Sequence, residues 1–431
     1  MKRLCAIIAT LCVGAAVWAQ EITWMNYAQP QEKAIMEKVI EKFEKAHPGV
    51  KIKFISVTMD QFGPKIQAAL AANNLPDVFY VGPEAIRTYV DNKKLLSLTP
   101  YVEGAKKSGM NVNDIYENAL NKYRYDGKKV GTGDLWALPK DLGPFAFGYN
   151  KDLFKKAGIP LPDKDKPYTF AEFTDVCKKL TKDVNGDGKM DQWGTGLNVR
   201  WSFIQFAWGN GGDFLDASKT KVDIANPKFY EALQYWADHT LKDGITPTMG
   251  EAQSMDTYQR WLKGEIAFFP VAPWDLAAFK NLSFEYDVIP WPVGKAGMKS
   301  ATWVGSVGYG VAANTKHPEL AAEFALYLSA DKEAMEMMTD MDLQIPNLKS
   351  LAPRYVNKPG YPANRQEYID IINDYGRSWP AEFTYNAVWF DEFWINIQTV
   401  LDGKVTAKEY CEKMQPKMQK LLDRANSKMK K

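Results

Sequence analysis

Glu-Ile-Thr-Trp-Met-Asn-Tyr-Ala-Gln, residues 21–29, predicts a short strand followed by a loop. Residues 31–46 come next and place apolar side chains at helical spacing, so they predict a helix. Residues 50–57 alternate as a second strand does, residues 62–72 are helical, and residues 76–81 predict a third strand. Strands that alternate with helices indicate an α/β fold with a parallel sheet.

The ends of these strands carry polar side chains. In an open parallel sheet the ligand crevice lies at the carboxyl ends of the strands. Asn26, Tyr27, Tyr80 and Glu84 all fall at such ends. These four residues are therefore candidates for contact with a ligand.

The second half of the chain keeps alternating but is richer in helices. Its predicted helices cover residues 229–241, 319–328, 368–375, 388–400 and 407–425. No repeat, low-complexity tract or obvious linker interrupts the chain. Two domains without a linker are either tightly fused or joined by several crossing strands.

The composition argues against several classes of function. The chain has 431 residues, enough for two or three domains, and is 46% hydrophobic and 25% charged, as soluble globular proteins are. Because 54 Lys and Arg face 52 Asp and Glu, the formal net charge is only +2, which argues against a nucleic-acid partner. The 14 Trp, 21 Tyr and 21 Phe suit either a large core or stacking surfaces for sugar rings.

The N-terminus has the pattern of a secretory signal peptide. Met1-Lys2-Arg3 is basic, an apolar run follows to Val17, and Val17-Trp18-Ala19 ends in a small residue. We expect cleavage after residues 1–19 and a periplasmic or extracellular location. An uncleaved anchor and a lipoprotein are the alternatives. Cys177 and Cys411 remain after cleavage, and the sequence leaves open whether they pair or stay separate thiols.

Five ordered blocks of the chain resemble a known family. They lie within residues 21–50, 75–78, 136–158, 264–274 and 304–324. Each block is weak alone, but their order and spacing run over nearly the whole mature chain. The chain resembles the extracellular solute-binding proteins of ABC sugar importers, the maltose-binding-protein-like family 1.

The resemblance implies a two-lobe α/β fold, of the type II periplasmic-binding-protein kind, with a hinge that the chain crosses more than once. By analogy, residues 20–142 and 290–340 form lobe one, and residues 143–289 and 341–431 form lobe two. The ligand is expected in a cleft that closes around it. The family is not catalytic, and the expected protein is a monomer without an organic cofactor.

Several of the candidate ligand residues rest on this resemblance. Trp274 follows Pro273 after a buried strand and, in the family, faces the sugar from lobe two; the alternative is a core Trp. Asp141 lies near the first crossover, where a carboxylate can accept two adjacent hydroxyls. Where members that bind maltodextrins carry a ligand-contacting Glu, this chain has Gly143, which argues against a maltodextrin ligand. The full predicted set is Trp24, Asn26, Tyr80, Glu84, Asp141, Trp208, Asn210, Trp274, Trp303 and Trp379.

The sharpest local motif lies at residues 183–194 and predicts a calcium loop, in which position 1 is Asp183. Positions 1, 3, 5 and 9 carry oxygen ligands, position 7 offers a backbone carbonyl, and position 6 is Gly, as in an EF-hand. Position 12 is Gly194 instead of a bidentate Glu, and the flanks lack the paired helices of an EF-hand. The alternative is an Asx-rich turn without metal. The predicted ligands of this structural Ca²⁺ are Asp183, Asn185, Asp187, Lys189 and Asp191.

Three functions remain open at this stage. The first is a receptor that captures a sugar or oligosaccharide and delivers it to the permease subunits of an ABC importer. The second is a secreted glycoside-active enzyme, which would need two carboxyl groups across a scissile bond. The third is a calcium-dependent carbohydrate-binding surface protein. The absence of a nucleophile elbow, zinc motif or phosphate loop favours the receptor.

Overall fold

The first lobe is built on a five-stranded sheet. The computed structural model describes residues 20–28, 30–105 and 109–428, so the predicted signal peptide lies outside the described residues. The strand order is β2-β1-β3-β13-β6. The strands are β1 (Gln20–Tyr27), β2 (Val50–Val57), β3 (Val78–Val81), β6 (Ala137–Pro139) and β13 (Gly308–Val311).

Helices cover this sheet, among them α1 (Pro30–Ala46), α2 (Met59–Ala71) and α13 (Pro318–Ala330). Helix α1 buries five apolar side chains at a spacing of three and four residues, which is the pattern of a helix with one apolar face. These side chains are Ile35, Met36, Val39, Ile40 and Phe43.

The second lobe has a four-stranded sheet in the order β11-β8-β10-β9. Its strands are β8 (Ala146–Asn150), β9 (Trp193–Thr195), β10 (Ile266–Val271) and β11 (Tyr286–Ile289). Its core is rich in Phe and Trp. The main helices of this lobe are α7 (Phe170–Leu180), α8 (Val199–Gly209), α9 (Pro227–Leu241), α17 (Val388–Ile395) and α19 (Ala407–Asn426).

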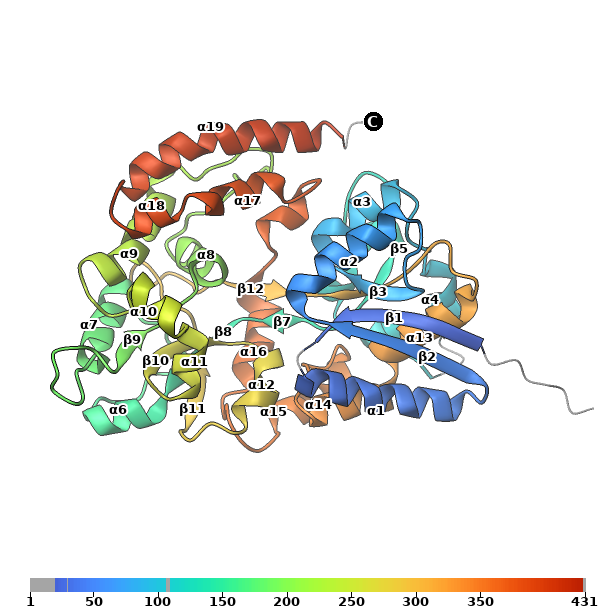
Figure 1. Ribbon diagram of the computed structural model, residues 1–431, viewed down its shortest axis with the longest axis horizontal. Helices are drawn as coiled ribbons and strands as arrows, with labels where there is room; N and C mark the ends of the chain where they lie inside the picture. Colours follow the sequence, from blue (N-terminus) through green and yellow to red (C-terminus); the bar gives the residue numbers. More distant parts are fainter. Residues whose placement is uncertain (1–19, 29, 106–108, 429–431) are drawn as a thin grey trace, which may run out of the picture.

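A small three-stranded sheet joins the lobes. Strand β12 (Thr302–Gly305) pairs with β7 (Gly143–Pro144) on one side and with β14 (Gly376–Arg377) on the other. The chain leaves the first sheet after β6, passes through β7 into β8, and returns from β11 through β12 to β13. Figure 1 shows β7 and β12 in the middle, between the two lobes. The expected hinge with more than one crossing is present.

The main sheets of the two lobes contain both parallel and antiparallel strand pairs, whereas the alternation of strands and helices predicts parallel sheets. In the first lobe β1 is parallel to β2 and β3, but β13 is antiparallel to β3 and to β6. The reason is that β13 enters the sheet from the other lobe and not from a crossover helix. In the second lobe β8 is antiparallel to β10 and β11, and β9 is parallel to β10.

The lobe limits expected at residues 142/143 and 289/290 fall at the start of β7 and at the end of β11, and the division as a whole stays a prediction. One expected part differs. Residues 343–351 were expected in lobe two, but they pack on lobe one. Leu348 forms a bridge with Ile115, and the Ser350 amide donates to Asp114.

The remaining elements are short and connect these layers. Helices α17 and α18 replace one predicted helix, because the chain turns at residues 396–397. The shorter elements are β4 (Arg124–Tyr125), β5 (Asp134–Leu135), α3 (Ile86–Asp91), α4 (Thr99–Ala105), α5 (Glu117–Asn121), α6 (Lys151–Ala157), α10 (Met249–Ser254), α11 (Thr257–Leu262), α12 (Leu276–Phe279), α14 (Lys332–Asp340), α15 (Ala352–Val356), α16 (Gln366–Asp370), α18 (Gln398–Leu401), the 3₁₀ turns η1 (Pro83–Ala85), η3 (Val112–Asp114), η4 (Pro273–Asp275), η5 (Lys349–Leu351) and η7 (Pro380–Phe383), and the π-helical turn η6 (Ile371–Tyr375).

The fold answers the open question about the two cysteines. Cys177 and Cys411 are separate, buried, free thiols. Within the described part of the chain, no helix combines the length and the apolar character needed to cross a bilayer.

Candidate functional site

Four half-buried tryptophans from distant parts of the chain form one continuous surface, which we call the tryptophan surface: Trp201, Trp274, Trp303 and Trp379. They come from α8, η4, β12 and the residue before η7. Trp303 lies at the centre, with ring centroids 6.3 Å from Trp274, 5.7 Å from Trp201 and 5.3 Å from Trp379. Trp201 and Trp379 are 5.8 Å apart, which closes the group.

Two glycines allow these rings to lie close to the backbone of the connecting sheet. A Cβ atom at Gly143 would lie 2.5 Å from Cζ3 of Trp274, and one at Gly305 would lie 2.6 Å from Cζ2 of Trp303. Real Cβ contacts are longer than this. Gly143 is therefore required for the packing of Trp274, because a side chain at position 143 would collide with its ring.

A buried polar cluster lies at the ends of the first-lobe strands: Asn26, Tyr80, Lys140 and Asp141. Lys140 Nζ lies 2.7 Å from Asp141 Oδ2, and both side chains are nearly buried. Asn26 donates to the sulfur of Met36 at 2.9 Å. Among the described residues, Asn26 Oδ1 has no hydrogen-bond partner, and the Tyr80 hydroxyl lies beside the side chain of Asn26. An unsatisfied buried polar atom is costly, so Asn26 Oδ1 is suited to a group that a ligand brings.

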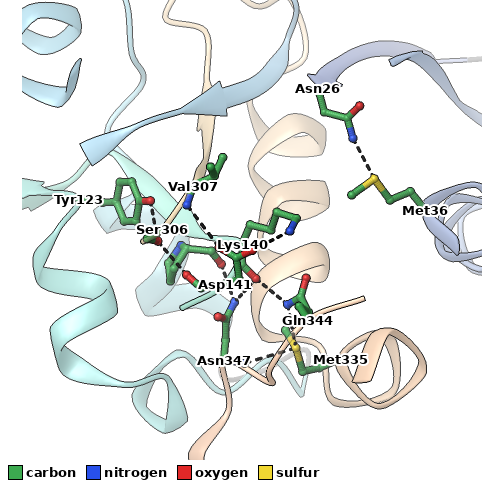
Figure 2. A network of polar contacts seen from close by, with 11 residues as sticks. Asn26, Met36, Tyr123, Lys140, Asp141, Ser306, Val307, Met335, Gln344 and Asn347 are labelled. Atoms are coloured by element: carbon green, nitrogen blue, oxygen red, sulfur yellow. Dashed lines mark hydrogen bonds and ion pairs between the residues drawn. The ribbon is translucent and has the colours of Figure 1, made fainter. Parts of the chain in front are cut away.

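The backbone at this crossover is held firmly, as Figure 2 shows. Gln344 and Asn347 donate from their side-chain amides to the carbonyl of Lys140 at 2.6 and 2.9 Å. The Ser306 hydroxyl donates to the carbonyl of Asp141 at 2.8 Å. Residues that follow β12 and α14 thus fix the position of the Lys140–Asp141 pair, which itself follows β6.

The tryptophan surface and the polar cluster meet through the start of α1. Helix α1 contacts α12, which follows directly on Trp274 and Asp275. Glu32, in the first turn of α1, raises both the pKa of Asp275 and the pKa of Tyr80, so its carboxylate lies near both groups. Burial is the main cause of each shift, and the pKa of Asp275 reaches about 7.

The raised pKa of Asp275 gives a pH-dependent prediction. The folded protein keeps the Asp275 proton to about pH 7, whereas an unfolded Asp loses it near pH 4, so this group makes stability fall as pH rises between those values. Asp275→Asn removes that loss. The melting temperature of the variant minus that of the wild type is therefore expected to increase from pH 5 to pH 8. A difference that stays constant in thermal melts across this range would contradict the assignment.

The structure places the other predicted ligand residues differently. The prediction that Trp24 contacts the ligand is wrong. Trp24 is fully buried, stacks on Phe54 at 4.6 Å, and is a core residue. Asn210 donates to the carbonyl of Lys228 at 2.7 Å and lies against Gly294, which is a structural role in a loop. Trp208 is 3% exposed, lies under the guanidinium of Arg377 at 5.4 Å, and presents no open ring face.

Glu84 lies in η1 directly after β3. Its side chain is exposed and folds back over Gly82. Its pKa is raised, chiefly because the hydration of the carboxylate is incomplete, and to a smaller extent because Glu382 is near. Glu84 therefore stays a candidate at the border of the site.

Three residues of the site were not predicted from the sequence: Trp201, Lys140 and Asp275. Trp201 lies on an apolar helix, where a core position was the natural interpretation. Lys140 and Asp275 directly neighbour the predicted Asp141 and Trp274. The sequence offered one signal for these two residues, which is that each lies next to a predicted site residue. A charged residue in a sequence does not show by itself how far the fold covers it.

The predicted calcium loop is a turn that bonds to itself. Asp183 accepts from the backbone amides of Gly186 and Gly188, and Asp191 accepts from those of Val184 and Asn185. Across the residues that the structure describes, no three His, Cys, Asp or Glu side chains are gathered as a metal site. A Cβ atom at position 12, Gly194, would lie 2.4 Å from Cys177 Cβ, so a side chain there has no room.

Comparison with known proteins identifies the family. The sequence model described as "Bacterial extracellular solute-binding protein" matches residues 27–335. The galactooligosaccharide-binding protein of Bacillus subtilis (strain 168) is 25% identical over 383 residues, which cover 87% of this chain and 83% of the relative. The maltodextrin-binding protein of the same organism is 25% identical, with 72% and 69% covered.

Solved structures share the fold. The substrate-binding protein Lmo0181 of Listeria monocytogenes, in complex with cycloalternan, has a TM-score of 0.81 at 23% identity and covers 94% of this chain and 99% of that one. The GacH receptor of Streptomyces glaucescens has a TM-score of 0.77 at 21% identity, with 94% and 99% covered. The chain belongs to the bacterial extracellular solute-binding protein family and has its two-lobe fold.

Proposed function

We propose that the protein captures a carbohydrate of oligosaccharide size between its lobes and delivers it to the permease subunits of an ABC importer. The observation that carries this proposal is the tryptophan surface next to the buried polar cluster. A flat aromatic ring suits the apolar C–H face of a pyranose. Four such rings in contact can follow more than one sugar unit.

The polar cluster supplies the complementary chemistry. A sugar ring stacked on Trp274 keeps its hydroxyls at the rim, where they need hydrogen-bond partners. The carboxylate of Asp141 accepts such hydrogen bonds, and so does the unpartnered Asn26 Oδ1, while the Tyr80 hydroxyl can donate or accept. The match of apolar faces and polar rims distinguishes a sugar from a purely apolar solute.

The family and its relatives support capture over cleavage. The family is one of binding proteins, and two relatives that match most of the chain are named for the galactooligosaccharide and the maltodextrin they bind, while another is named for sn-glycerol-3-phosphate. Delivery to permease subunits, a monomeric state and export with a cleaved signal peptide are parts of this proposal. Neither a secreted enzyme nor a calcium-dependent surface lectin is favoured by a separate observation.

The first test is a set of thermal melts with sugars of different types: β-1,4-galactotriose, arabinotriose, N,N′-diacetylchitobiose and maltotriose. A sugar at a thousand times its Kd adds about 4 kcal/mol to the free energy of unfolding, which is a large shift. We expect a large shift with one class and a weak one with maltotriose, since Gly143 replaces a maltodextrin contact. X-ray scattering should then show a smaller radius of gyration with that sugar. No shift with any sugar would refute the proposal.

We also propose that residues 183–191 bind Ca²⁺ through side chains of Asp183, Asn185, Asp187 and Asp191 and the carbonyl of Lys189. Asn185 Nδ2 already lies 3.4 Å from both Asp187 and Asp191, and Gly186 and Gly188 adopt positive φ angles of 78° and 86°, so the loop gathers its oxygens within one turn. The self-bonded turn would have to open its amide contacts to bind the ion.

The calcium proposal predicts a change in melting temperature. Because Ca²⁺ binds only the folded loop, millimolar Ca²⁺ should raise the melting temperature and EDTA should lower it. Asp187→Asn should remove the difference. Asp163→Asn, at an exposed Asp outside the loop, is the control and should keep it. Identical melts of the wild type in Ca²⁺ and in EDTA would refute the site.

A further inference from the structure

Trp379 lies in a segment that contacts both lobes. We call residues 376–384 the Trp379 segment. On one side, the ring of Trp379 lies 5.3 Å from Trp303 of the connecting sheet and 5.0 Å from Phe390 of the second lobe. On the other side, the backbone around it is bound by residues of the first lobe.

Lys122 and Glu382 make the contacts that flank Trp379. Lys122 Nζ donates to the Ser378 hydroxyl at 2.9 Å and to Glu382 Oε2 at 2.6 Å. The second carboxylate oxygen of Glu382 accepts from the backbone amide of Trp379 at 3.1 Å. Residues on both sides of Trp379, and its own amide, are thus bonded within one small network.

This network is closed off from water. The side chains of Lys122 and Glu382 are each 9% exposed. Arg87, which is 7% exposed, donates to the carbonyls of Glu382 and Thr384 at 3.2 and 2.6 Å. A buried ion pair of good geometry holds its partners in one arrangement, because separating the charges leaves each of them without a partner.

We propose that Lys122 and Glu382 are positioning residues that set the place of Trp379 in the tryptophan surface and thereby set the affinity for the bound sugar. The inference rests on the proposed function. Stacking needs the ring at a defined height and tilt beside Trp303, and a shift of the backbone amide by a fraction of an ångström moves the whole indole. The pair acts through Trp379 and touches no ligand itself.

The alternative is a pair that only stabilises the fold, and a double-mutant cycle separates the two. Glu382→Gln is made in the wild type and in Trp379→Ala, and Kd is measured by calorimetry with β-1,4-galactotriose, or with the sugar that gives the largest shift in the melts above. We expect Glu382→Gln to weaken binding about tenfold in the wild type and less than twofold in Trp379→Ala. An equal loss in both backgrounds, or no loss in either, would overturn the proposal.

Two further variants keep the test sharp. Lys122→Met combined with Glu382→Gln removes both charges, so no buried charge is stranded, and it should weaken binding as much as Glu382→Gln. Asp342→Asn breaks another buried ion pair, with Arg365, and should lower the melting temperature without changing Kd. Equal weakening by Asp342→Asn would mean that lost stability alone explains the effect, and would overturn the proposal.

Failure of the proposed function has a different signature. If no sugar binds, the receptor proposal falls, and the positioning role falls with it. If sugar binds but Trp379→Ala leaves Kd unchanged, Trp379 is not in the site, and a positioning role for Lys122 and Glu382 is overturned while carbohydrate capture stands.

Discussion

Replacing Trp274 by alanine is expected to weaken sugar binding about 100-fold, or by about 2.7 kcal/mol, while the protein stays folded. Trp274 is half-buried: its ring lies beside Gly143, Phe145 and Trp303, and part of it is open to solvent. Its removal deletes a stacking surface at the point where the tryptophan surface meets the polar cluster. It leaves little cavity, since the ring is not enclosed on all sides.

Trp394→Ala is the matched control for this measurement. Trp394 is also a half-buried tryptophan of the second lobe, but among the described ring contacts it packs against Phe390 and Phe393 on α17 and reaches the tryptophan surface only through Phe390. Calorimetry should show an unchanged Kd for Trp394→Ala and a Kd about 100-fold higher for Trp274→Ala. Equal affinities for Trp274→Ala and the wild type would remove Trp274 from the site.

Local patterns in the sequence predicted the elements of the first lobe well. The strand at residues 50–57 has the predicted bounds, and the helix predicted at 31–46 begins one residue earlier, at Pro30. These elements are decided by the spacing of neighbouring apolar residues, which a single sequence displays. The direction of β13 is different, because it depends on a return of the chain from the other lobe after more than 150 residues.

The same contrast explains which site residues could be predicted. Trp24 and Trp274 both lie in or just after a strand, and nothing nearby in the sequence separates them. In the fold, Trp24 lies on β1, the second strand of its sheet, and is enclosed by Phe54, Tyr309 and Phe324. Trp274 lies beyond the end of β10, in η4, where part of the ring stays open. The difference is made entirely by tertiary neighbours.

The largest effect on stability is expected at Asp342, which receives three cations. Lys358 Nζ lies 2.6 Å and Arg365 Nη1 3.2 Å from Oδ1, and Lys280 Nζ lies 2.8 Å from Oδ2. The side chains of Asp342 and Arg365 are 1% and 2% exposed. Asp342→Asn keeps the shape of the side chain, and Asn tolerates the positive φ of 57° at this position. The substitution therefore tests the charge and not the backbone.

We expect Asp342→Asn to lower the free energy of unfolding by about 3 kcal/mol at pH 7, because it leaves the Arg365 guanidinium buried without its counter-charge. Lys280 is half exposed and can turn to water, so its part of the loss is small. Urea titration measures the change. Asp340→Asn is the matched control: its pair with Arg354, at 2.5 Å, is exposed to solvent, so its loss should change the free energy of unfolding much less.

The pH dependence of this difference decides whether the charge is the cause. Burial alone would raise the pKa of Asp342, but the hydrogen bonds from Lys280 and Lys358 and the charge of Arg365 outweigh it, and the pKa is lowered. A lowered pKa in the folded state gives stability that is present above the ordinary Asp pKa of about 4 and is lost as pH falls through the folded value. The wild type should therefore lose its advantage over Asp342→Asn as the pH falls below about 4. If the difference in the free energy of unfolding stayed unchanged in acid, packing around Asp342, and not its carboxylate charge, would be the cause of the stabilisation.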